Sequence, residues 1–180
     1  MSVAVGKSGV NMTSQAGGGL WSGRQARLTA NASRAIYGTI VATALIAATS
    51  AHEDNPGRIG LTVLVTLLVF WLAHVYSAFL EHGLRQEQLA AAHLRATMAG
   101  EFAMVEAPGL SVAILFVGAL SWVDDRLAIN VALANGIVQL FLWGAAVARR
   151  LGRAWPAALV AGLVNAGFGV VIVLLKALLH

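Results

Sequence analysis

Apolar residues along the chain gather into five long segments that are separated by short polar connections. The segments cover about 35–51, 59–80, 102–123, 127–147 and 155–179, and none of them alternates like a β-strand. Each holds roughly the 20 residues that an α-helix needs to cross a hydrocarbon core of about 30 Å. Because a spanning helix satisfies its own backbone hydrogen bonds, the pattern predicts an all-α membrane protein, a bundle of five transmembrane helices over residues 34–180.

Two stretches depart from this pattern. Residues 1–33 are rich in Gly, Ser, Asn and Thr and have no sustained apolar run, which predicts a flexible cytoplasmic tail rather than a signal peptide. Between the second and third spans, apolar residues from Leu84 to Met98 recur at helical spacing among charged ones. The segment Glu81–Gly100 is therefore predicted to be an amphipathic helix, which either lies on the cytoplasmic membrane surface or extends a neighbouring span.

Composition supports a lipid environment. Hydrophobic residues make up 58% of the chain and charged residues 11%, whereas soluble domains average about 25% charged residues. So few charges do not cover a surface that faces water. The chain has no cysteine, which excludes disulfides, thiolate metal sites and thiol nucleophiles.

Basic residues are distributed unevenly between the two sides of the predicted bundle. Nine of the twelve fall in the tail or in the connections on its side of the membrane: Lys7, Arg24, Arg27, Arg34, Arg85, Arg95, Arg149, Arg150 and Arg153. By the positive-inside rule, the N-terminus is predicted to be cytoplasmic and the C-terminus outside, in the plasma membrane. The net charge of +4 then indicates contact with anionic lipid headgroups and not with nucleic acid.

Polar residues in four of the spans are predicted to lie at one depth, in the cytoplasmic half of the bundle, at about 1.5 Å per residue. They are His74, Glu106, Asn135, Gln139 and Asn165. Ionisable residues inside a membrane usually face the bundle interior or a watery cavity. One hypothesis is that His74 and Glu106 bind a proton or cation which the three amides orient. The alternative is a set of hydrogen bonds that joins the helices.

A break is predicted within the third span. Pro108 and Gly109 follow Glu106, and proline removes a backbone donor, so the helix should loosen beside this carboxyl group.

A metal site is a weaker candidate, formed by Glu81, His82 and Glu101 where the second and third spans reach the cytoplasm. None of the familiar metal-binding spacings is present, and solvated residues at the membrane boundary are the alternative. The sequence predicts no catalytic residue and no cofactor.

Small residues recur every four positions on the last two spans. The positions are Ala128, Ala132 and Gly136 on the fourth span, and Ala157, Ala161, Asn165 and Gly169 on the fifth. Such stripes let helices approach closely. They predict that these two helices pack together, or that the chain forms a homo-oligomer through them.

Four short segments carry a resemblance to a known group of proteins. They are Arg34–Gly38, Phe70–Tyr76, the Glu106-Ala-Pro108 step, and Leu163–Gly169 with the ending Lys176 to His180. In these segments the chain resembles small multi-pass membrane proteins common in high-GC actinobacteria. The resemblance covers residues 34–180 and implies the membrane topology but no activity.

Three functions remain open from the sequence. The first is a small channel or transporter coupled to cations or protons, with the polar layer as its site. The second is a non-catalytic membrane scaffold or accessory subunit, whose polar residues only hold the bundle together. The third is an intramembrane enzyme.

Overall fold

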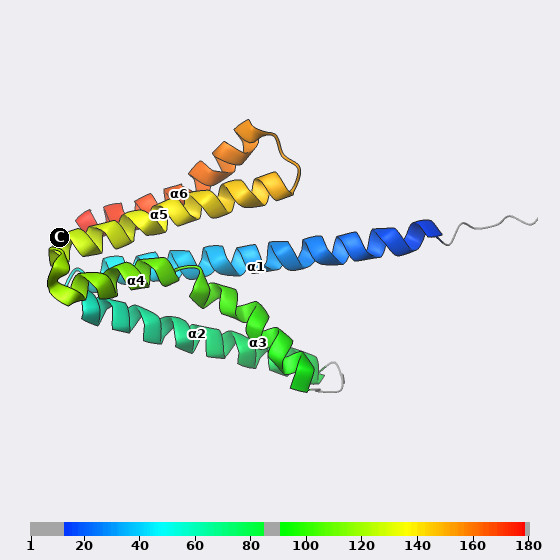
Figure 1. Cartoon of the computed structure of the whole chain (residues 1–180), viewed down its shortest axis with the longest axis horizontal. Coiled ribbons are helices and arrows are strands. Elements are labelled where there is room, and N and C mark those ends of the chain that lie inside the picture. The colour runs from blue at the N-terminus through cyan, green and yellow to red at the C-terminus, as the bar shows by residue number, and fades with distance from the viewer. Residues whose placement is uncertain (1–12, 85–90, 179–180) are drawn as a thin grey trace, which may run out of the picture.

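The structure, a computed structural model, describes residues 13–84 and 91–178, and these form helices joined by short turns (Figure 1). The elements are α1 (Thr13–Thr49), α2 (Pro56–Leu84), α3 (Ala91–Glu106), α4 (Gly109–Val117), the π-helical turn η1 (Gly118–Trp122), α5 (Asp125–Arg150) and α6 (Trp155–Leu178). No β-strand occurs in the described ranges. The all-α prediction is confirmed for this part of the chain.

In the described part of the chain, four helices are long and apolar enough to cross a membrane: Asn31–Thr49 within α1, Pro56–Glu81 within α2, and all of α5 and α6. A fifth crossing exists if Thr97–Glu106 and Gly109–Leu120 count as one span, which is bent by 47°. The structure is therefore compatible with four or five membrane spans. The bend lies where Pro108 predicts it.

The two stretches outside the predicted spans are largely helical. Helix α1 begins at Thr13, inside the segment assigned to a flexible tail, and residues 1–12 lie outside the described range. The segment 81–100 is divided, because α2 continues to Leu84 and α3 begins at Ala91. Residues 91–100 thus continue directly into the third span, and the stretch between Leu84 and Ala91 is not described.

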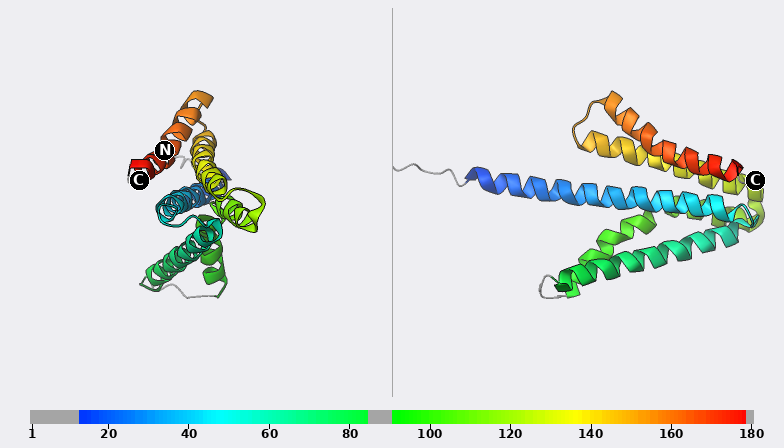
Figure 2. Two further views of the ribbon diagram at one scale, coloured as in Figure 1. Left: turned by 90° about the vertical axis from the view of Figure 1, so that its left-hand side faces the viewer. Right: turned by 180° about the vertical axis from the view of Figure 1, so that it is seen from behind.

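Helix α1 occupies the centre of the bundle. Figures 1 and 2 show it between the pair α5–α6 and the group α2–α3–α4, with its N-terminal part extending beyond them. In its span 44% of the residues are buried, against 17% to 33% in the other three single-helix spans. The same span has the lowest mean hydropathy of the four. A helix that is covered by protein does not need the apolar surface that lipid requires, which explains why the first apolar segment is the weakest.

Close contact between α1 and α3 depends on Gly38. A Cβ atom at this position would collide with the backbone carbonyl of Met104 and with the Met104 side chain. Pro108 lies four residues after Met104 and has no N–H to donate to that carbonyl, which is the bond a regular helix would make. Gly38 therefore packs against the carbonyl that the proline leaves without its usual helical partner.

Helix α5 meets α1 and α4 through the small residues predicted on the fourth span. A Cβ at Gly136 would collide with Thr43 of α1, and Ala128 lies against Gly118 of η1. The prediction that the fourth and fifth spans pack together is confirmed within the described residues, but the Ala128 to Gly136 stripe is not the surface that α5 presents to α6. The reason is geometric: α5 has neighbours on two sides, and the Ala128 to Gly136 stripe faces α1, α4 and η1 instead of α6.

Helices α5 and α6 form the most extensive contact between any two of the described elements. Gly144 of α5 lies against Ala161 and Asn165 of α6, and Gly162 of α6 lies against Phe141. The α6 stripe is thus used within the chain, and its partner surface on α5 includes Gly144, which is outside the predicted α5 stripe.

Replacing Gly38 with alanine should destabilise the bundle by about 1–3 kcal/mol, the usual cost of overpacking a close-packed interior. The added methyl group has no space between α1 and the Met104 carbonyl. Gly167→Ala is the matched control, since a Cβ at that α6 position meets nothing within 4 Å. Thermal unfolding in mild detergent measures both variants. Equal melting temperatures for the two would contradict the α1–α3 packing.

Candidate functional site

The polar layer predicted inside the spans contains one interhelical hydrogen-bond network. The side-chain amide of Asn135 on α5 donates to the Ser111 hydroxyl on α4 at 2.8 Å, and that hydroxyl donates to the backbone carbonyl of Ala132 at 3.2 Å. Ser111 is buried and Asn135 is half-buried. The network ties α4 to α5 directly beyond the break at Pro108.

Gln139 lies one turn beyond Asn135 on α5. Its Oε1 is the one buried side-chain oxygen or nitrogen in the described part of the chain that has no hydrogen-bond partner. Buried polar atoms are nearly always paired with protein or with ordered water. The oxygen is therefore available to a donor such as a water molecule, or to a cation.

His74 and Asn165 are engaged elsewhere. The Nδ1 atom of His74 lies 2.8 Å from the Phe70 carbonyl in its own helix, and its ring is 5.9 Å from that of Tyr37 on α1. The Asn165 amide donates to the Ala161 carbonyl at 3.2 Å. Asn165 also lines a cavity of about 320 Å³ between α5, α6 and α1, whose other lining residues are mainly apolar.

Glu106 is exposed on the side of the bundle, where α3 ends. It makes no hydrogen bond or ion pair with any residue that the structure describes, and the same holds between any two of the five predicted site residues. The structure thus brings Asn135 to Ser111 and leaves His74, Glu106 and Asn165 in separate surroundings. That any of the five binds an ion stays a prediction.

The metal candidates do not gather. Within the described residues, no three His, Asp or Glu side chains lie close enough to hold a metal ion. Glu101 instead forms an ion pair with Arg34, and Glu81 has an interaction of its own. The side chain of His82 lies outside the described part of the chain.

The ion pair between Arg34 and Glu101 joins α1 to α3. The Arg34 Nη2 atom lies 2.7 Å from the Glu101 carboxylate, whose side chain is 8% exposed, while that of Arg34 is 33% exposed. Arg34 also donates to Asn31, and the nearby Trp71 indole donates from α2 to the Met98 carbonyl of α3 at 3.2 Å. These contacts connect three helices at the end of the bundle where α3 begins.

A polar pocket that sequence reasoning missed lies at the opposite end of the bundle, called here the Lys176 pocket. Its volume is about 410 Å³, and it is lined by Ser50, Ala51, Asp54, Arg126, Ile129, Asn130 and Lys176. The Lys176 ammonium donates to the Ser50 hydroxyl at 2.7 Å, which ties α6 to the end of α1. The one available signal was Lys176, a lone cation near the end of an otherwise apolar segment.

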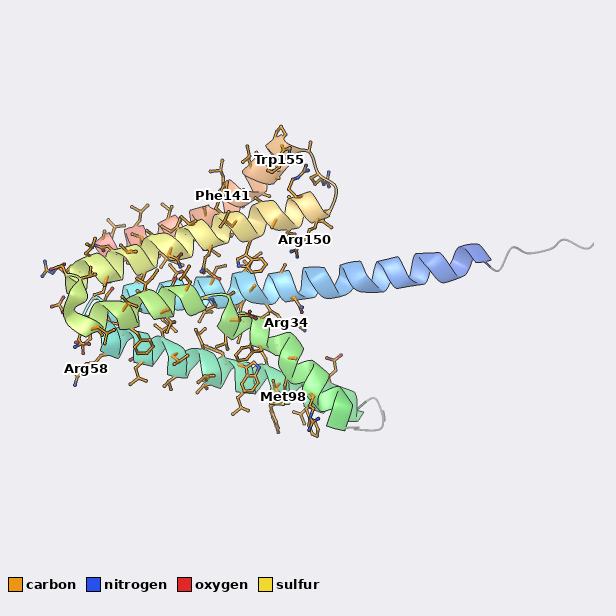
Figure 3. All side chains as sticks on the ribbon, viewed as in Figure 1. Arg34, Arg58, Met98, Phe141, Arg150 and Trp155 are labelled. Carbon is orange, nitrogen blue, oxygen red and sulfur yellow. The ribbon has the colours of Figure 1, made fainter. Side chains whose placement is uncertain are left out.

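Next to this pocket, the turn before α2 is organised by Glu53 and Asn55. The backbone N–H of Asn55 and the Arg58 guanidinium both donate to the Glu53 carboxylate, at 3.1 Å each, and the Arg58 backbone N–H donates to the Asn55 side chain. The pKa of Glu53 is held below its ordinary 4.5, first by the Asn55 backbone N–H and then by Arg58. Figure 3 shows Arg58 at this end and Arg150 at the other.

Comparison of the chain with protein-family models, with curated proteins and with solved structures finds no match in any of the three.

Glu101→Gln should destabilise the bundle by about 1–2 kcal/mol, because it leaves the partly buried Arg34 without its charged partner. This is less than the ~3–5 kcal/mol typical of breaking a fully buried pair, because a third of the Arg34 side chain remains exposed. In a double-mutant cycle with Arg34→Gln, the two residues should show a coupling of at least about 0.5 kcal/mol. The exposed pair Glu53–Arg58 is the matched control, and a coupling there as large as that of Arg34–Glu101 would argue against burial as the cause.

Glu53 should give the chain an acid-sensitive component of stability. Because its pKa in the folded chain lies below 4.5, the ionised form favours folding above pH 4.5, and this contribution is lost as the pH falls through the folded pKa. Thermal unfolding from neutral pH to about pH 3 should show wild type losing stability relative to Glu53→Gln. Identical pH profiles would mean that the turn does not depend on the carboxylate.

Proposed function

We propose that this chain is an integral protein of the plasma membrane with five spans, its N-terminus in the cytoplasm and its C-terminus outside. The bent pair α3–α4 is the third span, and the amphipathic segment around residues 81–100 lies on the cytoplasmic side. The charges support this orientation. Arg34, Arg149, Arg150 and Arg153 lie at one end of the bundle, and fewer basic residues, namely Arg58, Arg126 and Lys176, lie at the other.

Within the membrane we propose that the chain acts as a non-catalytic scaffold or accessory subunit, and the exposed Glu106 carries this proposal. It lies inside the bent span with no partner among the described residues. The residues four positions before and after it are apolar and exposed, with Phe102 44% exposed and Leu110 57% exposed. A charged side chain at the centre of a membrane costs about 2.5–3.5 kcal/mol on insertion scales.

A partner subunit removes this cost. A second membrane protein could place a hydrogen-bond donor or a cation against Glu106. It would then cover the carboxylate together with the exposed side chains of Phe102 and Leu110. The homo-oligomer predicted through the small-residue faces has less surface to use, because Gly136 already packs against Thr43, and Gly169 already packs against Ile137, within the same chain.

A cation- or proton-coupled channel or transporter is the second candidate. The observation that favours it is Gln139 Oε1, a buried acceptor that has no hydrogen-bond partner among the described residues. It lies one turn of α5 beyond Asn135, which donates a hydrogen bond to Ser111. Ser111 in turn donates to the Ala132 carbonyl. Against it stands the separation of the polar side chains, since His74 and Asn165 bond within their own helices. An intramembrane enzyme has no specific observation of its own.

The scaffold proposal predicts that Glu106 is required for assembly. A photo-crosslinking residue placed at Leu110 should capture one partner in native membranes, and Glu106→Gln should abolish that capture, because the amide no longer attracts the partner's donor as strongly. The matched control is a crosslinker at Leu163, a residue that is 64% exposed on α6 and distant in sequence from Glu106. Capture at Leu110 that survives Glu106→Gln would contradict the proposal.

Flux through proteoliposomes made from the purified chain separates the two candidates. A scaffold gives no cation or proton flux above that of empty vesicles. Flux that is present in wild type and lost in Glu106→Gln would favour the transporter and overturn the scaffold assignment.

A further inference from the structure

The Lys176 pocket draws its polar groups from four parts of the chain that come together only in the fold. Ser50 follows the end of α1, Asp54 lies in the turn before α2, Arg126 and Asn130 are in the first turns of α5, and Lys176 is near the end of α6. A volume of about 410 Å³ is within the range of pockets that hold small ligands. The pocket is therefore an open concave site that is large enough for a small polar ligand.

The cations of the pocket have unused hydrogen-bonding capacity. Neither Arg126 nor Lys176 forms an ion pair with any residue that the structure describes, and Lys176 uses one of its three donors on Ser50. Asp54 is the only acidic residue among those that line the pocket. The lining thus carries two positive charges and one negative charge, with the Asn130 amide as a further neutral donor.

The depth of the pocket suits one kind of ligand. Ser50 directly follows the candidate span Asn31–Thr49, and Lys176 lies two residues before the end of the candidate span of α6. On the membrane topology proposed above, on which this step rests, this is the level at which a bilayer places its headgroup phosphates. Arginine and lysine donors match phosphate oxygens in charge and in hydrogen bonding.

We propose that the Lys176 pocket binds a phosphate group, with Arg126 and Lys176 neutralising its charge and Asn130 donating a further hydrogen bond. The phosphate belongs either to a phospholipid headgroup or to a soluble phosphate ligand. The Asp54 carboxylate repels the phosphate group and therefore limits the affinity of the pocket for it. The site is independent of Glu106, which lies on a different helix and on the side of the bundle.

The test is native mass spectrometry of the full-length chain, titrated in detergent with phosphatidylglycerol or with a diacylglycerol of the same acyl chains. Only the phospholipid should bind specifically. Each of Arg126→Gln and Lys176→Gln should weaken that binding about fivefold, which corresponds to roughly 1 kcal/mol for each cation at a membrane surface. Asp54→Asn should strengthen the binding, which a merely structural role for these residues would not do.

Arg58→Gln is the matched control, because it removes one exposed cation at the same end of the bundle but outside the pocket. Arg126 is exposed and makes no hydrogen bond with any residue that the structure describes, so its replacement should leave the fold intact, and an unchanged melting temperature verifies this. Inorganic phosphate added to the lipid-bound chain distinguishes the two sources of the phosphate group. Competition with the lipid at millimolar concentration indicates a soluble phosphate ligand. No competition indicates the phospholipid headgroup. Equal binding of both lipids without any phosphate binding, or an equal loss in Arg58→Gln, would overturn the proposal.

Discussion

The packing of α1 against its neighbours is the constraint on which the rest of the bundle depends. Gly38 lets α1 reach the Met104 carbonyl of α3, and Gly136 of α5 makes room for Thr43 from the other side. The hydroxyl groups of Thr39 and Thr43 donate hydrogen bonds to backbone carbonyls of α1 itself, so they bring no unsatisfied donor into the interface. The central helix thus has small side chains at its contacts and satisfies the hydrogen bonds of its buried threonines. Helices on both sides can therefore pack against it closely.

The two ends of this central helix are fastened by different polar contacts. Near the start of its span, Arg34 pairs with the buried Glu101 of α3, and just past its end Ser50 accepts a hydrogen bond from Lys176 of α6. In a membrane, apolar surface alone gives helices little reason to associate, because lipid tails are equally apolar. Close packing in the middle and polar contacts at the boundaries together define which helices are neighbours.

The helices themselves could be predicted because hydropathy and length depend on local sequence, and the bend depends on the local effect of Pro108. The candidate site could not be predicted in the same way. The depth of a residue in a membrane follows from its position in a span, but the neighbours that its side chain meets depend on how the helices pack. His74, Glu106 and Asn165 have similar predicted depths and different neighbours. The Lys176 pocket escaped prediction for a related reason, since its residues are up to 126 positions apart and only the fold brings Ser50 to Lys176.

The central place of the first candidate span has a consequence for the order in which the helices pack during synthesis. The least apolar of the candidate spans is the first to leave the ribosome, and two of the helices that cover it, α5 and α6, are the last. Until they arrive, its threonines and small residues have no protein neighbours on that side. On the proposed membrane topology, the first span therefore completes its packing only after the C-terminal hairpin of α5 and α6 has been made.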